Sequence, residues 1–253
     1  MKKKNRKLVW ITGASSGIGK ELCFKLSQEG WNIALTARRK PELEKISKML
    51  NNKNLVCSAD VKSKSEVKLA FEKLFSTFKK IDLAILNAGV YQSVDCKTID
   101  SEIFKHHMEV NYLGVIHCLE QIIPKMISQR TGHIAIITSP TGWRGLPKAA
   151  AYGPTKSALK NLAQSLRYDL EPFGIKVQLF CPSFVETEAT PKGEHSLPGI
   201  ISANKAANLI YNSLNLNSFE NFIPNNYLIW VLYLLKFLPE NLSYKLIKWG
   251  TGY

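Results

Sequence analysis

The sequence predicts an α/β fold in which a single doubly wound parallel sheet is flanked by helices, with a small apolar helical extension at the C-terminal end. Three observations predict it. Short apolar runs alternate with longer amphipathic stretches, a glycine-rich turn follows the first run, and no linker or internal repeat divides the chain. With 253 residues, of which 45% are hydrophobic and 21% charged, the chain is long enough to bury one large core.

Six apolar runs are the expected strands, because continuous apolar runs suit strands that are covered on both faces. They are 8–11, 32–37, 55–59, 81–88, 133–138 and 175–180. The expected helices between and after them are 18–29, 41–50, 64–78, 101–128 and 155–171, with Pro41 at the start of one and Pro172 at the end of another. Strands that alternate with helices predict right-handed crossovers and therefore a parallel sheet.

The last part of the chain has a different pattern. Residues 227–238, YLIWVLYLLKFL, are almost wholly apolar, Pro239 interrupts them, and NLSYKLIKWG follows. The first stretch is too short to cross a bilayer. Three interpretations stay open: helices lying on a membrane surface, a flap over an apolar substrate pocket, or a contact between subunits. We therefore divide the chain into a main domain, residues 1–225, and the C-terminal extension, residues 226–253.

Basic residues outnumber acidic ones, with 34 Lys and Arg against 20 Asp and Glu, and the net charge is +14. This balance favours anionic partners such as phosphorylated cofactors or acidic lipid. Nucleic acid is not an expected partner, because no basic stripe is interleaved with stacking aromatics. The opening MKKKNRK leads into an apolar stretch too short for a signal peptide. The five scattered cysteines show no disulfide or zinc spacing and indicate a reducing cytoplasm.

A glycine-rich turn, TGASSGIGKEL, joins the first expected strand to the first expected helix. Gly13, Gly17 and Gly19 let the backbone approach a pyrophosphate, whose charge the helix N-terminus favours. The second expected strand ends TARRK, where a dinucleotide site meets the adenosine ribose. Arg38 and Arg39 stand there in place of an acidic residue and favour the 2′-phosphate of NADP(H). A packing loop and two surface arginines are the alternative interpretation.

In this order the motifs resemble the short-chain dehydrogenase/reductase family, from the first strand to about residue 190. TGASSGIG at 12–19 is similar to the family's TGxxxGxG turn, Asp60-Val61 to its adenine contact, and Asn87-Ala88-Gly89 to its NAG motif. The resemblance implies that the cofactor, NADP(H), is bound by Gly13, Ser15, Ser16, Gly17, Ile18, Gly19, Arg38, Arg39, Asp60, Val61, Asn87, Ala88, Gly89, Tyr152, Lys156, Pro182, Val185 and Thr187.

The resemblance also covers a catalytic set. Ser139 ends the fifth expected strand thirteen residues before Tyr152, Lys156 completes YGPTK, and Asn111 lies in the long helix. A free tyrosine has a pKa of about 10, so a nearby cation is needed to favour phenolate, and Lys156 lies one helical turn away. Tyr152 is then the expected general acid in reduction and base in oxidation. By resemblance, Lys156 also binds the nicotinamide ribose, Ser139 holds the substrate oxygen and Asn111 keeps a water in place.

Two positions depart from the family pattern. Ser183 stands where glycine is usual after the sixth strand, and Pro154 replaces a small residue within YGPTK, although proline fits the first turn of a helix. The family uses the following stretch, here about 188–203, as a lid over the substrate. In it, Lys192, Glu194 and His195 are candidate polar contacts or simply residues of an exposed loop.

Other conspicuous residues have plainer explanations. His106 and His107 have no partner at metal-ligand spacing, so no metal site is expected and both are interpreted as packing or surface residues. Trp143 and Arg144, between Ser139 and Tyr152, are interpreted either as the mouth of the substrate site or as loop packing.

Together the motifs predict an NADP(H)-dependent oxidoreductase that moves a hydride between nicotinamide and a ketone or secondary alcohol. The C-terminal extension is similar to the tails of membrane-associated family members that reduce keto-lipids. That similarity implies an apolar or lipid-like substrate and peripheral contact with the inner face of a membrane in a cytoplasmic protein. By resemblance, helices 101–128 and 155–171 form a homodimer or homotetramer. An NADPH-binding sensor without turnover is the alternative, although the Ser-Tyr-Lys set is intact.

Overall fold

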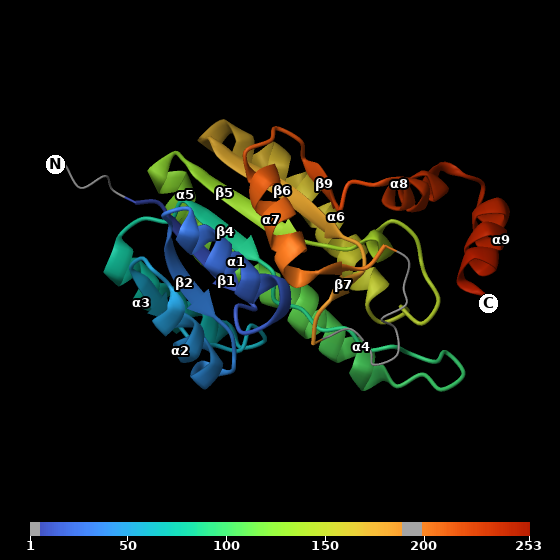
Figure 1. The fold of residues 1–253 in the computed structure, drawn as a ribbon, viewed down its shortest axis with the longest axis horizontal. Helices are drawn as coiled ribbons and strands as arrows, with labels where there is room; N and C mark the ends of the chain where they lie inside the picture. Colours follow the sequence, from blue (N-terminus) through green and yellow to red (C-terminus); the bar gives the residue numbers. More distant parts are fainter. Residues whose placement is uncertain (1–5, 189–198) are drawn as a thin grey trace.

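Seven parallel strands form one sheet in the computed structural model, which describes residues 6–188 and 199–253 (Figure 1). The strands are β1 (Leu8–Thr12), β2 (Asn32–Thr36), β3 (Asn54–Val56), β4 (Leu83–Leu86), β5 (Gly132–Ile137), β6 (Ile175–Pro182) and β9 (Glu220–Ile223). Their order is β3-β2-β1-β4-β5-β6-β9, and every pairing is parallel. The chain therefore winds outward from β1 in both directions, and the predicted doubly wound sheet is confirmed.

Helices cover both faces of the sheet because the strands are apolar on both faces (Figure 1). Successive side chains of β1 alternate between two cores: Val9 and Ile11 pack on one face, Leu8 and Trp10 on the other. The first face carries α1 (Gly17–Gln28), α2 (Lys40–Met49) and α7 (Ala203–Leu214). The second carries α3 (Lys64–Phe78), α5 (Gly114–Gln129) and α6 (Gly153–Leu170).

The long helix expected over 101–128 is divided into three parts. It consists of α4 (Ser101–His107), a π-helical segment (Met108–Leu113) and α5. A π-helical segment widens the helix locally and often marks a functional site. Here it contains Asn111, whose side chain is fully buried.

One strand of the sheet and one helix packed on it are not among the elements expected from the sequence. The strand β9 extends the sheet beside β6, and α7 packs against α1. The segment ENFI of β9 is short, with Asn221 and Ile223 buried and Glu220 and Phe222 half-buried, so it becomes a strand through its pairing with β6 rather than through an apolar pattern of its own. A further pair of short strands, β7 (Val185–Glu186) and β8 (Ile201–Ser202), flanks residues 189–198, which lie outside the described residues.

The C-terminal extension forms α8 (Tyr227–Leu234), a 3-10 turn (Leu235–Phe237) and α9 (Glu240–Thr251). The two helices are separated at Pro239, where the sequence predicts an interruption. These helices project from the end of the sheet that carries β9 (Figure 1). The aromatic rings of Trp143, Phe222, Trp230 and Tyr233 hold α8 to the body, with centroids between 4.8 and 5.8 Å apart. Within residues 6–188 and 199–253, no helix combines the length and apolar character that a membrane span requires.

Candidate active site

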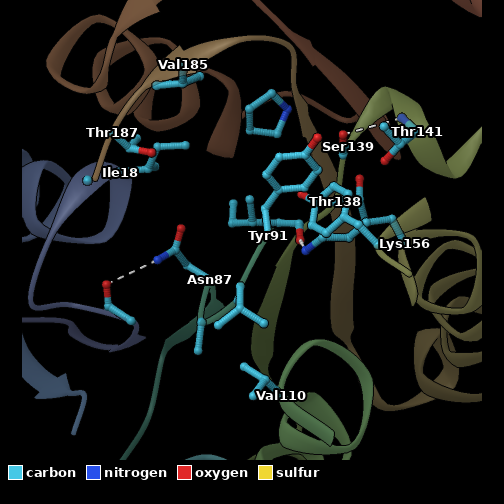
Figure 2. Close-up of a pocket in the computed structure, with 18 of the residues that line it drawn as sticks. Ile18, Asn87, Tyr91, Val110, Thr138, Ser139, Thr141, Lys156, Val185 and Thr187 are labelled. Carbon is cyan, nitrogen blue, oxygen red and sulfur yellow. Dashed lines mark hydrogen bonds between the residues drawn. The ribbon is translucent and has the colours of Figure 1, made fainter. Parts of the chain in front are cut away.

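A cavity of about 880 Å³ opens at the carboxyl ends of the strands, near β1 and β4 where the winding of the sheet reverses. Strand-to-helix turns meet there, so residues that are far apart in sequence share one wall. The predicted cofactor residues that line the cavity are Gly13, Ser15, Ser16, Gly17, Ile18, Arg38, Arg39, Asp60, Val61, Asn87, Ala88, Gly89, Tyr152, Lys156, Pro182, Val185 and Thr187. In Figure 2, Ile18, Val185 and Thr187 lie on one side of the cavity, and Ser139 and Lys156 lie on the other.

The glycine turn has a backbone that depends on glycine. Gly13 and Gly17 have φ angles of +68° and +52°, a region that side chains disfavour. Gly19 is not on the cavity wall; instead, a Cβ at this position would lie 2.2 Å from the Gly13 carbonyl oxygen. The Asn87 amide donates to the carbonyl oxygens of Thr12 and Gly13 at 3.1 and 3.3 Å, which ties the end of β4 to the turn.

Arg39 lies beside this turn at the end of β2. Its guanidinium donates to the Ser15 hydroxyl, with Nε and Nη2 at 3.3 and 3.2 Å from Oγ. Its Nη1 pairs with the Glu188 carboxylate at 2.9 Å. Arg38 lines the same part of the cavity, so two cations stand where the sequence predicts an anionic group of the cofactor.

Tyr152 and Lys156 lie at the start of α6. Tyr152 precedes the helix, Pro154 lies in its first turn, and the Lys156 amide donates to the Tyr152 carbonyl oxygen at 3.3 Å. The expectation that Pro154 leaves the helix intact is confirmed. The Lys156 ammonium lies 5.3 Å from the centroid of the Tyr152 ring and donates to the Ile137 carbonyl oxygen at 3.1 Å.

Burial dominates the protonation of this pair. It raises the pKa of Tyr152 to about 12, against a hydrogen bond with Ser139 that lowers it. Burial also lowers the pKa of Lys156 to about 8. From the sequence, the lysine charge is expected to have the main effect on the pKa of Tyr152. In the folded protein the loss of hydration is larger, because Lys156 is buried and Tyr152 is half-buried.

Ser139 lies beside Tyr152, and Asn111 lies near Lys156. Ser139 follows β5 by two residues and caps the start of a short 3-10 turn, Pro140–Gly142. The amide of Asn111 accepts from Val90 N at 2.7 Å and donates to Val90 O at 3.0 Å and to the Thr155 hydroxyl at 3.2 Å. Asn111 lies behind the cavity wall. A Cβ at Gly89 would be 3.3 Å from its Oδ1 and 3.7 Å from Lys156 Nζ, so the glycine keeps the gap between them open.

Other predicted residues lie elsewhere. His107 is buried and structural, with Nε2 accepting from Gln92 N at 3.1 Å and Nδ1 at 2.7 Å from the Ile103 carbonyl oxygen. Trp143 and Arg144 do not line the cavity and pack against the C-terminal extension, so the packing interpretation is the correct one of the two. The candidate contacts Lys192, Glu194 and His195 lie outside the described residues.

The structure adds a group of residues that sequence reasoning missed. These residues line the same cavity and are Tyr91, Leu146, Pro147, Lys148, Phe184, Leu232, Thr251 and Tyr253. The Tyr91 ring meets the Tyr152 ring edge to face, with centroids 5.2 Å apart. Proximity to the NAG motif was a signal for Tyr91. No local pattern places Leu232, Thr251 or Tyr253 at a cavity formed mainly by the first 188 residues.

Comparisons with known proteins agree with this fold. Residues 7–197 match the family model described as short chain dehydrogenase. An uncharacterized oxidoreductase of Staphylococcus epidermidis is 35% identical over 192 residues, which cover 75% of this chain and 83% of that protein.

Two solved structures share the fold. A short-chain dehydrogenase/reductase from Burkholderia phymatum in complex with NAD aligns with a TM-score of 0.83 and 23% identity, over 92% of this chain and 94% of that one. An alcohol dehydrogenase from Thermococcus sibiricus complexed with 5-hydroxy-NADP aligns with a TM-score of 0.76 and 25% identity, over 86% and 94% of the two chains.

Proposed function

The chain belongs to the short-chain dehydrogenase family, and from that premise we propose that it catalyses hydride transfer between NADP(H) and a ketone or secondary alcohol. The observation that carries the proposal is that Ser139, Tyr152 and Lys156 share one cavity with the glycine turn. A hydride donor and a proton donor are both needed at a carbonyl, and this cavity offers room for the first beside the second.

The residues present fit a dinucleotide. Gly13 and Gly17, whose φ angles are positive, keep the turn free of side chains. The helix α1 begins directly there, so its N–H groups and dipole are directed at a phosphate. Arg38 and Arg39 supply the positive charge that a 2′-phosphate needs, which supports NADP(H) rather than NAD(H). The bound nicotinamide supplies or accepts the hydride.

The protein's own residues handle the proton. Tyr152 donates its phenol proton to the carbonyl oxygen in reduction and takes it back in oxidation. With its pKa raised to about 12, the phenol is protonated at neutral pH and is a weak acid, so proton transfer requires a cation that stabilises the phenolate. Ser139 donates a hydrogen bond to the same oxygen, which orients the carbonyl. Lys156 stabilises the phenolate that forms, and Asn111, across the gap at Gly89, holds the water through which the proton is replaced.

An apolar or lipid-like substrate is supported by part of the cavity lining. Leu146, Phe184 and Leu232 are among its side chains, and the last of these comes from the C-terminal extension. We therefore propose that residues 1–225 form the catalytic domain and that the extension closes the substrate end of its cavity.

Peripheral membrane contact by a cytoplasmic protein is proposed on the outer face of the extension. Phe237 and Trp249 are 67% and 85% exposed there, and Lys236 and Lys248 are their neighbours in sequence. Apolar side chains flanked by lysines suit the interface of an anionic bilayer. By family resemblance we also propose a homodimer or homotetramer.

Titration with NADPH and with NADH, followed by ketone-dependent oxidation of the reduced cofactor, tests the enzyme proposal. We expect tighter binding of NADPH and turnover with ketones of increasing chain length. The Tyr152→Phe protein should bind NADPH normally and lose turnover by at least about a hundredfold. If the wild-type protein binds NADPH but oxidises it with none of a graded series of ketones, the alternative of an NADPH-binding sensor without turnover is favoured. The intact Ser-Tyr-Lys set argues against that alternative.

A further inference from the structure

The loop at residues 139–144, here the Ser139 loop, is fixed to α6 on its inner side. It begins with Ser139, makes the 3-10 turn and ends with Trp143 and Arg144. The Ser157 hydroxyl donates to the Gly142 carbonyl oxygen at 3.0 Å. A Cβ at Gly142 would lie 2.9 Å from the Lys156 carbonyl carbon, so the loop backbone is in direct contact with the helix that carries Tyr152 and Lys156.

Trp143 fixes the outer side of this loop. Its indole N–H donates to Glu220 Oε1 at 2.7 Å, and Lys160 Nζ pairs with the same carboxylate at 2.9 and 3.0 Å. The side chains of Lys160 and Glu220 are only 18% and 14% exposed, so the ion pair is shielded from solvent. The Trp143 ring also meets the Phe222 and Tyr233 rings at 5.0 and 5.1 Å, and thus bridges β9 and α8.

Arg144 fixes the loop to the end of α8 and the start of α9. Its Nη2 donates to the carbonyl oxygens of Leu235 and Leu238 at 3.3 and 2.9 Å, and its Nη1 pairs with the Glu240 carboxylate. The Leu235 carbonyl oxygen already accepts from the Leu238 amide at 3.3 Å, so the guanidinium adds a second donor there and supplies a charged donor to the Leu238 carbonyl oxygen. The Arg144 side chain is 20% exposed.

From these contacts we infer that the C-terminal extension holds the Ser139 loop in its working position, and that Trp143 and Arg144 are positioning residues for Ser139. Neither residue lines the cavity, so each acts through the loop backbone. The inference rests on the proposed function and adds a second task for the extension besides closing the cavity. Because the loop is held between α6 and α8, the Ser139 hydroxyl stays directed at Tyr152. A small displacement of the loop would weaken the hydrogen bond between these two side chains.

Arg144→Gln is the main test, with a pH profile as the readout. The Ser139 hydrogen bond lowers the pKa of Tyr152, so a displaced Ser139 should move the apparent pKa of alcohol oxidation upward, and Ser139→Ala should do the same. The other groups that influence or face Tyr152, which are Lys156, Tyr91 and Cys181, are unchanged in both variants. We expect kcat to fall roughly tenfold with an unchanged Kd for NADPH.

The matched control is Arg130→Gln. Arg130 also donates to a carbonyl oxygen, that of Pro172, and lies over the Phe173 ring, but it precedes the amino end of β5, whereas the cavity lies at the carboxyl ends of the strands. Its removal should change neither kcat nor the pH profile. An Arg144→Gln protein with the kcat and pH profile of the wild type would overturn the inference.

Two further measurements separate positioning from general loss of stability. Trp143→Phe keeps an aromatic ring but removes the N–H donor to Glu220. It should shift the pH profile of alcohol oxidation in the same direction as Arg144→Gln. In the double variant Ser139→Ala with Arg144→Gln, the losses in kcat should be less than multiplicative, because the second change acts only through the first residue. Multiplicative losses would contradict positioning. If Tyr152→Phe keeps full turnover, the proposed function fails; if it is inactive while Arg144→Gln is normal, only this inference fails.

Discussion

The Glu188 carboxylate pairs with the Arg39 guanidinium at 2.9 Å on the wall of the cavity, so the protein places an anion of its own where we propose the 2′-phosphate of NADP(H). The two side chains are 66% and 47% exposed, and solvent screens the pair. A bound phosphate has to share Arg39 with Glu188 or displace it.

Glu188→Gln should therefore bind NADPH about three- to fivefold more tightly than the wild type, because the substitution removes a repulsion of about 1 kcal/mol between the carboxylate and the 2′-phosphate. Its affinity for NADH should not change. Fluorescence titration of both cofactors measures this. Glu120→Gln is the control, since Glu120 pairs with Lys64 at 2.9 Å and does not line the cavity. Equal gains with NADPH and NADH would mean that Glu188 does not act on the 2′-phosphate.

Gly19→Ala should damage the phosphate turn although Gly19 does not line the cavity. The new Cβ would lie 2.2 Å from the Gly13 carbonyl oxygen and 2.6 Å from Asn87 Nδ2, so the turn has to move. We expect a loss of about 1–3 kcal/mol in the free energy of unfolding and at least about tenfold weaker NADPH binding. Urea denaturation and cofactor titration measure the two effects. Gly250→Ala, where a Cβ in α9 meets no atom within 4 Å, should weaken neither the fold nor NADPH binding; unaltered NADPH binding in Gly19→Ala would refute the prediction.

His133 should make the fold sensitive to mild acid. Burial, the largest cause, and the Lys176 charge on the neighbouring strand together lower its pKa to about 4, and the nearby Gln178 side chain opposes both. An unfolded histidine has a pKa of about 6.5, so protons bind preferentially to the unfolded chain. This contribution to stability is complete above about pH 6.5 and is lost as the pH falls toward 4.

The measurement is the free energy of unfolding in urea at pH 7 and pH 4.5. His133→Gln cannot gain the buried charge, so its stability should fall by about 1–2 kcal/mol less between these pH values than that of the wild type. His106→Gln serves as the control and should follow the wild type. If His133→Gln loses as much stability as the wild type, His133 does not carry the acid sensitivity.

Trp249→Ser should weaken the proposed membrane contact without affecting chemistry. Trp249 is 85% exposed on α9, and its burial in a bilayer interface is favourable. We expect roughly threefold to tenfold weaker sedimentation with vesicles containing phosphatidylserine, and an unchanged kcat on a short water-soluble ketone. Met49→Ser on α2, where the side chain is 68% exposed, is the control. Equal vesicle binding by the wild type and Trp249→Ser would exclude this face as the contact.

Local patterns were sufficient for much of the fold and of the candidate site. The first six strands are continuous apolar runs, and a run that is apolar on both faces has one stable environment, a sheet covered on both sides. The glycine turn and the pair Tyr152 and Lys156 are also local, because four residues of a helix bring two side chains to one face whatever the rest of the chain does. Each of these was predicted from its own few residues.

Tertiary structure decided the remainder. The strand β9 exists because the edge of β6 offers it hydrogen-bonding partners, and the π-helical segment around Asn111 interrupts what the sequence pattern presents as one helix. The pKa of Tyr152 follows from burial rather than from its distance to Lys156. Leu232 reaches the cavity because Trp143 and Arg144 hold the C-terminal extension against the Ser139 loop. These outcomes depend on the loss of hydration and on packing between distant segments, and no short stretch of sequence encodes either.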